Sequence, residues 1–147
     1  MSVLRIFTIG FTRTTAEAFF SRLQKAGVRR VVDVRLNNTG QLAGFTRRDD
    51  LAFFLRTIGA MDYVHKPMLA PTQEMLRAYR DGKKSWEDYA KAFLLLLTER
   101  QIEKTLRDDI RTGDCLLCSE ATPDQCHRRI VAEHLQKHWD GTQIEHL

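Results

Sequence analysis

Short runs of β-branched and aliphatic residues alternate with helix-forming segments along the whole chain, and this alternation limits the possible folds more than any other feature. Five runs are predicted as strands, at residues 3–9, 28–35, 61–65, 114–120 and 142–147. Two consecutive antiparallel strands can be joined by a short turn, whereas two parallel strands need a long crossover connection, usually a helix. Strands that alternate with helices are therefore expected to pair in parallel. The chain therefore predicts an α/β fold with a mainly parallel central sheet of about five strands and helices on both faces.

Length and composition fit one compact unit. The chain has 147 residues, of which 43% are hydrophobic and 29% charged. A chain of this size buries roughly two thirds of its unfolded surface without needing a disulfide or a metal. The sequence contains no repeat, low-complexity tract or linker, so we expect a single α/β domain spanning residues 1–147.

Several features predict a cytoplasmic protein with no membrane partner. The longest apolar run, residues 92–97, falls far short of the ~20 residues of a membrane span. The first five residues lack the basic start and the cleavage site of a signal peptide. Three cysteines are too few, and odd in number, for a secreted disulfide framework. A net charge of +4 favours an anionic partner, either a small molecule or a nucleic acid. The sequence gives no prediction of the oligomeric state.

Chemically reactive side chains lie at the carboxyl ends of the predicted strands or directly after them, at the edge of the sheet where parallel α/β folds bind ligands. Catalytic roles are predicted for Asp33, Cys118, Glu120, Cys126 and His127. Substrate-binding roles are predicted for Gly10, Phe11, Thr12, Arg35, Asn37, His65 and Arg128. Because the carboxyl ends of parallel strands lie along one edge, we expect these residues to form one site.

Some of these residues also have a purely structural interpretation. Asp33 and Arg35 are two apart on a buried strand and share a face, so they form either a site pair or an ion pair that caps the sheet. Glu120 shares the face of Cys118 and is either an acid–base group or a solvent-facing helix cap. His65 is either a site member or a polar tip at the sheet edge.

The residues Thr122, Pro123 and Gln125 predict the start of a helix, with a cap, a proline in the first turn and a capping box. The free N–H groups and positive dipole end of a helix attract anions. Arg128 lies on the predicted buried face and is expected to grip a phosphate or carboxylate, whereas Arg129 is expected to point to solvent.

The cysteines permit several interpretations. Cys115 and Cys118, followed by Cys126 and His127, have a spacing typical of zinc ligands. Residues 115 and 118 point to opposite faces of a strand and adjacent residues diverge on a helix, so neither a metal nor a cofactor is predicted. A thiol in a first helical turn favours its thiolate, which makes Cys126 the expected thiolate. Cys118 is a nucleophile, a disulfide partner of Cys126, or a buried core residue.

Five segments carry a resemblance to a known family: Thr8-Ile9-Gly10, Val32-Asp33-Val34-Arg35, Tyr63-Val64-His65, Cys118-Ser119-Glu120 and Cys126-His127-Arg128. In these segments the chain resembles the domain of unknown function family 488. The resemblance extends over nearly the whole chain, to the closing Ile-Glu-His-Leu. It implies the same fold and the same site, and it leaves the reaction open.

The chain departs from the family pattern in two places. A His-Ser pair commonly follows Thr-Ile-Gly in the family, and here it is Phe11-Thr12. A proline- and serine-containing stretch usually follows the Val-Asp-Val-Arg strand, and here it is Leu36-Asn37-Asn38-Thr39. If the replaced histidine is catalytic in relatives, this chain would bind without turnover, or would use His65 or His127 instead.

The leading functional hypothesis is an enzyme that acts on an anionic substrate, such as a nucleotide or a nucleic-acid component. Arg35 and Arg128 would hold the anion, Asp33 or Glu120 would be the acid or base, and His127 would assist. The same residues fit acid–base hydrolysis and a covalent route with a cysteine nucleophile.

Two other functions fit the sequence. One is a non-catalytic nucleic-acid-binding module, whose salt-dependent affinity would come from basic residues including Arg47, Arg48, Arg77 and Arg80. The other is a thiol redox or sulfur-handling protein built on Cys118 and Cys126. That function requires the two Cα atoms to lie within about 7 Å of each other.

Overall fold

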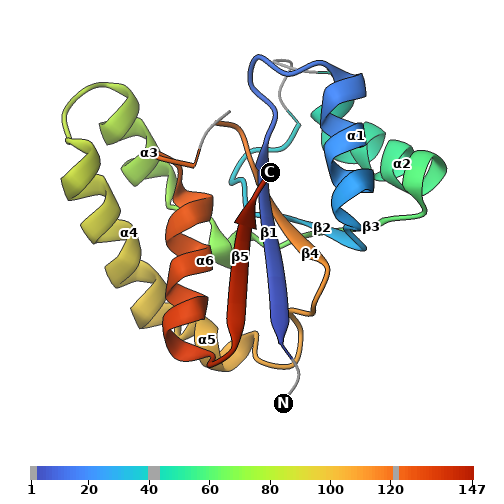
Figure 1. Ribbon diagram of the computed structural model, residues 1–147. Helices are drawn as coiled ribbons and strands as arrows, with labels where there is room; N and C mark the ends of the chain where they lie inside the picture. The colour runs from blue at the N-terminus through green and yellow to red at the C-terminus, as the bar shows by residue number, and fades with distance from the viewer. Residues whose placement is uncertain (1–2, 40–43, 121–122) are drawn as a thin grey trace.

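Five strands form one all-parallel sheet in the computed structural model, which describes residues 3–39, 44–120 and 123–147 (Figure 1). The strand order is β3-β2-β4-β1-β5. The strands are β1 (Leu4–Gly10), β2 (Arg30–Asp33), β3 (Asp62–His65), β4 (Asp114–Cys118) and β5 (Thr142–His146). The predicted α/β fold with a parallel sheet of about five strands is confirmed.

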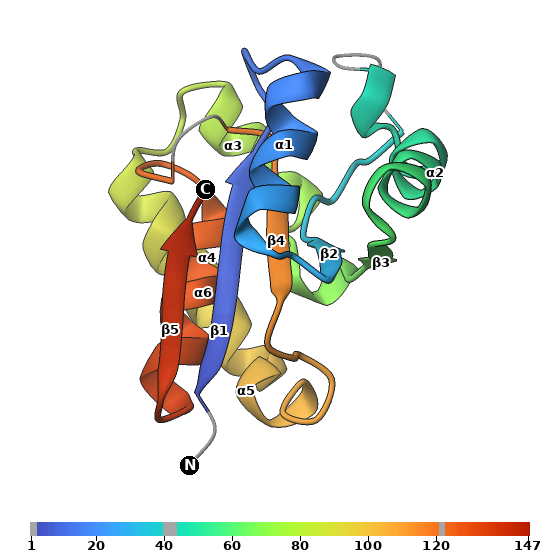
Figure 2. The same ribbon diagram turned by 45° about the vertical axis from the view of Figure 1, so that its right-hand side comes forward.

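Helices cover both faces of the sheet (Figures 1 and 2). One face carries α1 (Ala16–Ala26) and α2 (Arg48–Gly59). The other face carries α3 (Gln73–Arg80), α4 (Trp86–Arg100), α5 (Ile102–Thr105) and α6 (His127–His138). Two short 3₁₀ turns, η1 (Gly44–Thr46) and η2 (Pro67–Leu69), lie in the connections. None of the described helices is long and apolar enough to cross a membrane.

The side chains of β4 alternate between two hydrophobic cores. Cys115 and Leu117 belong to the core beneath α1 and α2, whereas Leu116 and Cys118 belong to the core beneath α4, α5 and α6. All five residues of β4 are buried, as expected for a strand with neighbours on both sides and helices on both faces. This period-two alternation places Cys115 and Cys118 on opposite faces, as predicted from their spacing.

The carboxyl end of β4 lies where the chain connections leave toward opposite faces of the sheet. The neighbouring strands β1 and β2 continue into α1 and α2 on one face, whereas β4 continues into α6 on the other (Figure 2). Ligand sites of open α/β sheets form at such points, because the diverging connections leave a crevice between them. Cys118, the last residue of β4, lines a cavity at this point.

The helix predicted to start at Pro123 starts instead at His127, so that prediction is wrong. Pro123 begins a turn in which its carbonyl oxygen accepts from the N–H of Cys126, at 3.3 Å. Cys126 then adopts an extended conformation, with φ −135° and ψ 137°, as the N-cap of α6. The predicted cap Thr122 lies outside the described residues. The turn allows the side chains of Cys126 and His127 both to approach Cys118.

Strand β2 ends at Asp33, two residues earlier than predicted. The N–H of Val34 still donates to the carbonyl oxygen of Leu117, at 3.1 Å, but the chain then leaves the sheet. The carbonyl oxygen of Arg35 accepts a hydrogen bond from Nε2 of His65, at 2.7 Å. The N–H of Arg35 donates to the carboxylate of Asp33, at 3.1 Å, and not to a neighbouring strand.

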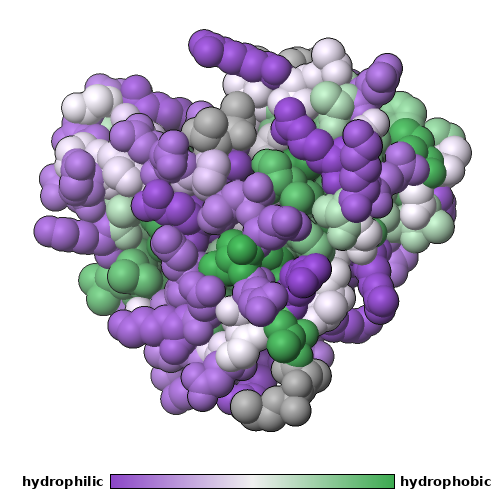
Figure 3. Space-filling view, viewed as in Figure 1, coloured by the Kyte–Doolittle hydropathy of each residue, from purple (hydrophilic) through white to green (hydrophobic). Residues whose placement is uncertain are grey.

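The surface seen in Figure 3 is mainly hydrophilic, and its hydrophobic side chains form small separate groups. This agrees with a chain whose apolar residues are mostly buried in the two cores beneath the helices.

Candidate functional site

A small open cavity of about 120 Å³ lies at the carboxyl end of β4. Six of the predicted site residues line it: Arg35, Asn37, Cys118, Glu120, Cys126 and His127. The structure therefore brings together half of the predicted site around one opening. The remaining six do not line the cavity and instead contact the residues that do.

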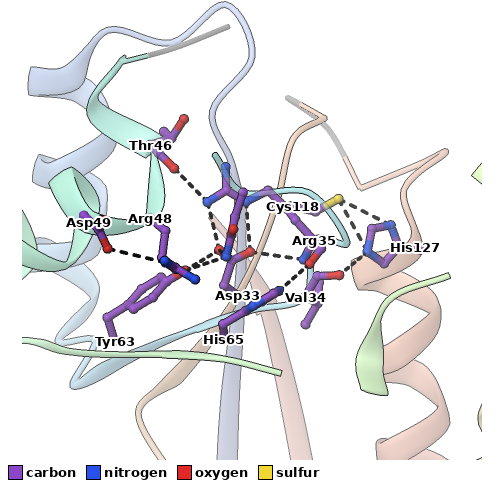
Figure 4. Close-up of polar contacts among 11 residues, drawn as sticks. Asp33, Val34, Arg35, Thr46, Arg48, Asp49, Tyr63, His65, Cys118 and His127 are labelled. Carbon is purple, nitrogen blue, oxygen red and sulfur yellow. Dashed lines mark hydrogen bonds and ion pairs between the residues drawn. The ribbon is translucent and has the colours of Figure 1, made fainter. Parts of the chain in front are cut away.

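The central feature of the cavity is the pairing of Cys118 with His127 (Figure 4). The Nε2 atom of His127 lies 2.8 Å from the carbonyl oxygen of Val34, which can only accept a hydrogen bond. The neutral ring therefore carries its proton on Nε2, and the Nδ1 lone pair is free. Nδ1 lies 3.4 Å from the Sγ atom of Cys118. The arrangement is an oriented base beside a thiol, the pattern of nucleophilic catalysis.

Burial keeps the His127 ring neutral. The side chain is 7% exposed, and burial lowers the pKa of His127 below its ordinary value. The ring of Phe93 packs edge-on against it, with the ring centroids 5.4 Å apart. The backbone carbonyl and the phenyl ring together fix the orientation of the base.

The thiol of Cys118 is the one that the structure favours as a thiolate. Burial opposes its ionisation, but four other influences outweigh burial and lower the pKa of Cys118. They are hydrogen bonds from the Cys126 thiol and from the backbone at Ser119 and Glu120, and the positive charge of Arg128. Donors that satisfy a sulfur anion in this way stabilise it in a site that water reaches poorly.

Cys126 does not lie in the first turn of α6, the position from which its thiolate was predicted, and the pKa of its thiol is shifted in the opposite direction to that of Cys118. Its hydrogen bond to Cys118 and its burial raise the pKa of Cys126. Because Cys126 caps the helix instead of lying in its first turn, its thiol acts as a donor toward Cys118. Cys115 is fully buried on the other face, and burial raises the pKa of its thiol.

The argument that Cys126 and His127 diverge is also wrong. The ligand atoms of Cys118, Cys126 and His127 all lie within 4.8 Å of one another. Two sulfurs and an imidazole nitrogen form a set that soft or borderline metal ions such as Zn²⁺ accept. The same proximity brings the two sulfurs close enough for redox chemistry to be considered.

Asp33 and Arg35 form a buried, two-pronged ion pair beside the cavity (Figure 4). The Nε and Nη2 atoms of Arg35 donate to the two carboxylate oxygens of Asp33, at 2.9 and 2.8 Å. The hydroxyl of Tyr63 donates to the same carboxylate at 2.6 Å, and the amide of Asn38 approaches it at 3.5 Å. With so many donors around it and no exposed surface, Asp33 holds Arg35 in place and does not line the cavity, and its predicted catalytic role stays a prediction.

Tyr63 and Asn38 are site-supporting residues that the sequence analysis missed. Burial, followed by the hydrogen bond to Asp33, raises the pKa of Tyr63. A signal was available for Tyr63, since it lies two residues before His65 on a strand and shares its face. Asn38 carries no comparable signal, because it belongs to a loop whose path depends on tertiary contacts.

The residues after β1 hold the backbone that follows β4. The N–H groups of Phe11 and Thr12 donate to the carbonyl oxygen of Ser119, at 3.2 and 2.9 Å. The hydroxyl of Thr12 donates to the same oxygen at 2.6 Å. The ring of Phe11 lies under the Arg35 guanidinium, which is 5.3 Å from the ring centroid. These residues position the cavity wall and do not line it.

Arg128 is buried behind this wall and is not exposed in the cavity. Its side chain has no exposed surface. Its Nη1 atom donates to the carbonyl oxygen of Glu120 at 2.6 Å, and its Nε atom donates to the hydroxyl of Thr8 at 3.3 Å. Its Nη2 atom has no hydrogen-bond partner among the described residues. The structure therefore places Arg128 as a support for the Glu120 backbone, and its predicted grip on an anion stays a prediction.

Aromatic residues form the opposite wall of the cavity and were not predicted as site residues. The rings of Tyr79 and Tyr89 stack with their centroids 4.8 Å apart, and Trp86 lies 5.5 Å from Tyr89. All three line the cavity, together with the exposed Arg80. The sequence gives no site signal for these residues, because an aromatic residue on an amphipathic helix usually packs into the core.

Comparison with known proteins gives one match. The profile of the family described as "Domain of unknown function DUF488" matches residues 15–135. No curated protein and no solved structure matches the chain.

Proposed function

Because the chain belongs to this DUF488 family, whose description names no reaction, we propose a function from the geometry of the cavity: a thiol-dependent enzyme with Cys118 as its nucleophile. One observation carries the proposal. The Nδ1 lone pair of His127 faces the Cys118 sulfur at 3.4 Å, while Nε2–H is fixed on the Val34 carbonyl. This arrangement matches the nucleophile, base and orienting group of a catalytic triad, with a backbone carbonyl as the third member.

The proposed reaction begins when Nδ1 of His127 accepts the thiol proton of Cys118. The sulfur then forms a bond to an electrophilic carbon of the substrate. The bond from that carbon to its leaving group breaks, and the leaving group takes the proton from His127. Water, activated by the same ring, attacks the covalent intermediate and restores the thiol. Glu120, exposed at the cavity wall, supplies a second acid–base group.

The cavity limits the substrate. Pockets that enclose whole drug-sized ligands measure roughly 300–1,000 Å³. A cavity of about 120 Å³ admits a small reactive group and leaves the rest of the substrate outside it. A planar portion would rest against Tyr79 and Trp86, and an anionic portion would lie near the exposed Arg80. The proposed substrate is therefore still anionic, but Arg80 is proposed to bind its anionic group in place of Arg128.

A second candidate function is reversible thiol oxidation, and it is favoured by the proximity of the two sulfurs. The Sγ atoms of Cys118 and Cys126 lie within 4.8 Å, and the Cys126 thiol donates to the Cys118 sulfur. A peroxide would accept two electrons and two protons from the two thiols, so that the S–S bond forms as the O–O bond breaks. Hydrogen peroxide would leave as two water molecules, and an alkyl hydroperoxide as one alcohol and one water.

The test uses p-nitrophenyl acetate, whose planar leaving group is coloured and whose acetyl group is small. We expect a burst of p-nitrophenolate equal to the enzyme concentration, and acetyl-Cys118 identified by peptide mass spectrometry. Cys118→Ser should abolish both, and Cys115→Ala, the matched thiol control on the other face, should retain both. A burst that persists in Cys118→Ser, or acetylation confined to other residues, would refute the proposed nucleophile. Peroxide treatment followed by non-reducing mass spectrometry decides the second candidate.

A further inference from the structure

A second cluster of side chains that can act as metal ligands lies far from the cavity, at the carboxyl end of α6. We propose that Glu103, His134 and His138 form a binding site for a divalent transition metal ion such as Zn²⁺ or Ni²⁺. The ligand atoms of the three side chains all lie within 4.8 Å of one another. The proposal goes beyond the thiol chemistry proposed for Cys118 and does not depend on it.

The spacing of the two histidines suits chelation of one ion. They are four residues apart on α6, so their side chains lie on the same side of the helix. Their ring centroids are 4.6 Å apart. A pair of imidazoles one helical turn apart is a recurrent arrangement of metal ligands in proteins.

Glu103 of α5 completes the set. Its Oε2 atom lies 3.1 Å from Nε2 of His134. Zinc binds nitrogen and oxygen ligands at about 2.0–2.2 Å, so two ligand atoms of a tetrahedral ion lie roughly 3.4 Å apart. The glutamate and His134 already have nearly this separation. A His–Glu ion pair alone would account for the 3.1 Å distance, but it would not account for the second imidazole against the first.

The cluster is held firmly on one side and open on the other. His134 is 5% exposed, whereas His138 is exposed to solvent. The indole Nε1 of Trp139 donates to the backbone carbonyl oxygen of Glu103 at 2.9 Å, which fixes α5 against the end of α6. Two ligands are therefore set in advance, and an ion enters from the His138 side, where water completes its coordination.

The site is separate from the cysteine cluster. His127 and His138 are the first and last residues of α6, so at about 1.5 Å per residue they lie roughly 16 Å apart along the helix. Each cluster also has its own tryptophan, since Trp86 lines the cavity and Trp139 contacts Glu103. The chain contains no other tryptophan. Binding at the two clusters can therefore be measured independently.

The test is a titration of the Trp86→Phe protein with Ni²⁺, a quencher of indole fluorescence, so that Trp139 alone reports. We expect saturable quenching that EDTA reverses and that Zn²⁺ prevents by competition. Loss of even an outer-shell partner weakens metal binding about 10–100-fold. Loss of a ligand in His138→Gln or Glu103→Gln should therefore raise the midpoint at least about tenfold. Glu133→Gln, an exposed carboxylate on the same helix, should leave the midpoint unchanged.

His138 is exposed, so His138→Gln is expected to fold. A changed midpoint in this variant would therefore report the loss of a ligand and not the loss of the fold. Quenching that does not saturate, or an equal midpoint in His138→Gln and in the Trp86→Phe parent, would overturn the proposal. Co²⁺ absorption gives an independent check: the proposed site produces no thiolate-to-cobalt charge-transfer band. If that band appears and Trp139 is not quenched, the ion binds at the cysteine cluster and this proposal is wrong.

Discussion

Gly10, the last residue of β1, is the position where one added methyl group should do the most damage to the site. A Cβ atom at residue 10 would lie 1.5 Å from the carbonyl oxygen of Glu120 and 2.9 Å from Nη1 of Arg128. The first contact is with backbone, so it cannot be relieved by a side-chain rotation. Gly10→Ala must therefore push away the segment after β4, whose backbone groups hydrogen-bond to the Cys118 sulfur.

The expected loss of stability follows from two effects. Forcing an extra carbon into a packed site costs about 1–3 kcal/mol. Displacing the Glu120 carbonyl from the guanidinium of Arg128, now 2.6 Å apart, removes a charge-assisted hydrogen bond that contributes about 1.5–3 kcal/mol. We expect Gly10→Ala to lower the free energy of unfolding by about 2.5–6 kcal/mol, the sum of the two effects.

Urea denaturation measures this loss, and Gly44→Ala is the matched control. A Cβ at Gly44 has no heavy atom within 4 Å and replaces no left-handed residue. Its effect should therefore lie near zero, within about 0.5 kcal/mol or slightly stabilising. If Gly10→Ala and Gly44→Ala are equally stable at the same m-value, the close approach of β1 to Glu120 is refuted.

Three further changes test the supporting contacts. Asp33→Asn leaves the buried guanidinium of Arg35 without its counter-charge. It should lower the free energy of unfolding, measured by urea denaturation, by about 3–5 kcal/mol. Tyr63→Phe removes one donor to that carboxylate and should cost about 1.5–3 kcal/mol; an unchanged midpoint would contradict its role. Burial lowers the pKa of His127 in the folded state. As pH falls, the imidazole is therefore protonated in the unfolded chain before it is protonated in the folded protein. The free energy of unfolding should decrease as pH falls below about 6.5, the ordinary pKa of histidine. His127→Gln should lose less stability than the wild type between pH 7.5 and 5.5, and identical losses would show that His127 is not buried as a neutral ring.

The fold was predictable because its signals are local. Apolar β-branched runs such as Val31–Val34 indicate buried strands, and segments with helical periodicity between them require parallel pairing. The strand order places the last strand, β5, at one edge of the sheet. The general position of the candidate site followed from the same local evidence, because reactive residues such as Cys118 lie at the ends of strands or directly after them.

The detailed roles within the site were not predictable, because they depend on contacts between distant parts of the chain. Pro123 gives the same local signal for a turn as for a helix start. Here it begins a turn, and Cys126 at the end of that turn lies against Cys118. Arg128 is placed by the hydroxyl of Thr8, 120 positions away in the sequence. No local pattern could show that its guanidinium is buried in the wall instead of exposed in the cavity.

The central claim, that Cys118 is the activated nucleophile, is tested most directly by the pH dependence of its alkylation with iodoacetamide, followed by peptide mass spectrometry. The account predicts that Cys118 reacts fastest, with an apparent pKa below the ~8.5 of a free cysteine. Cys126→Ala should raise that pKa, because the Cys126 thiol donates to the Cys118 sulfur, whereas Cys115→Ala should leave it unchanged. An apparent pKa at or above that of free cysteine, or faster alkylation of Cys126 than of Cys118, would contradict the account.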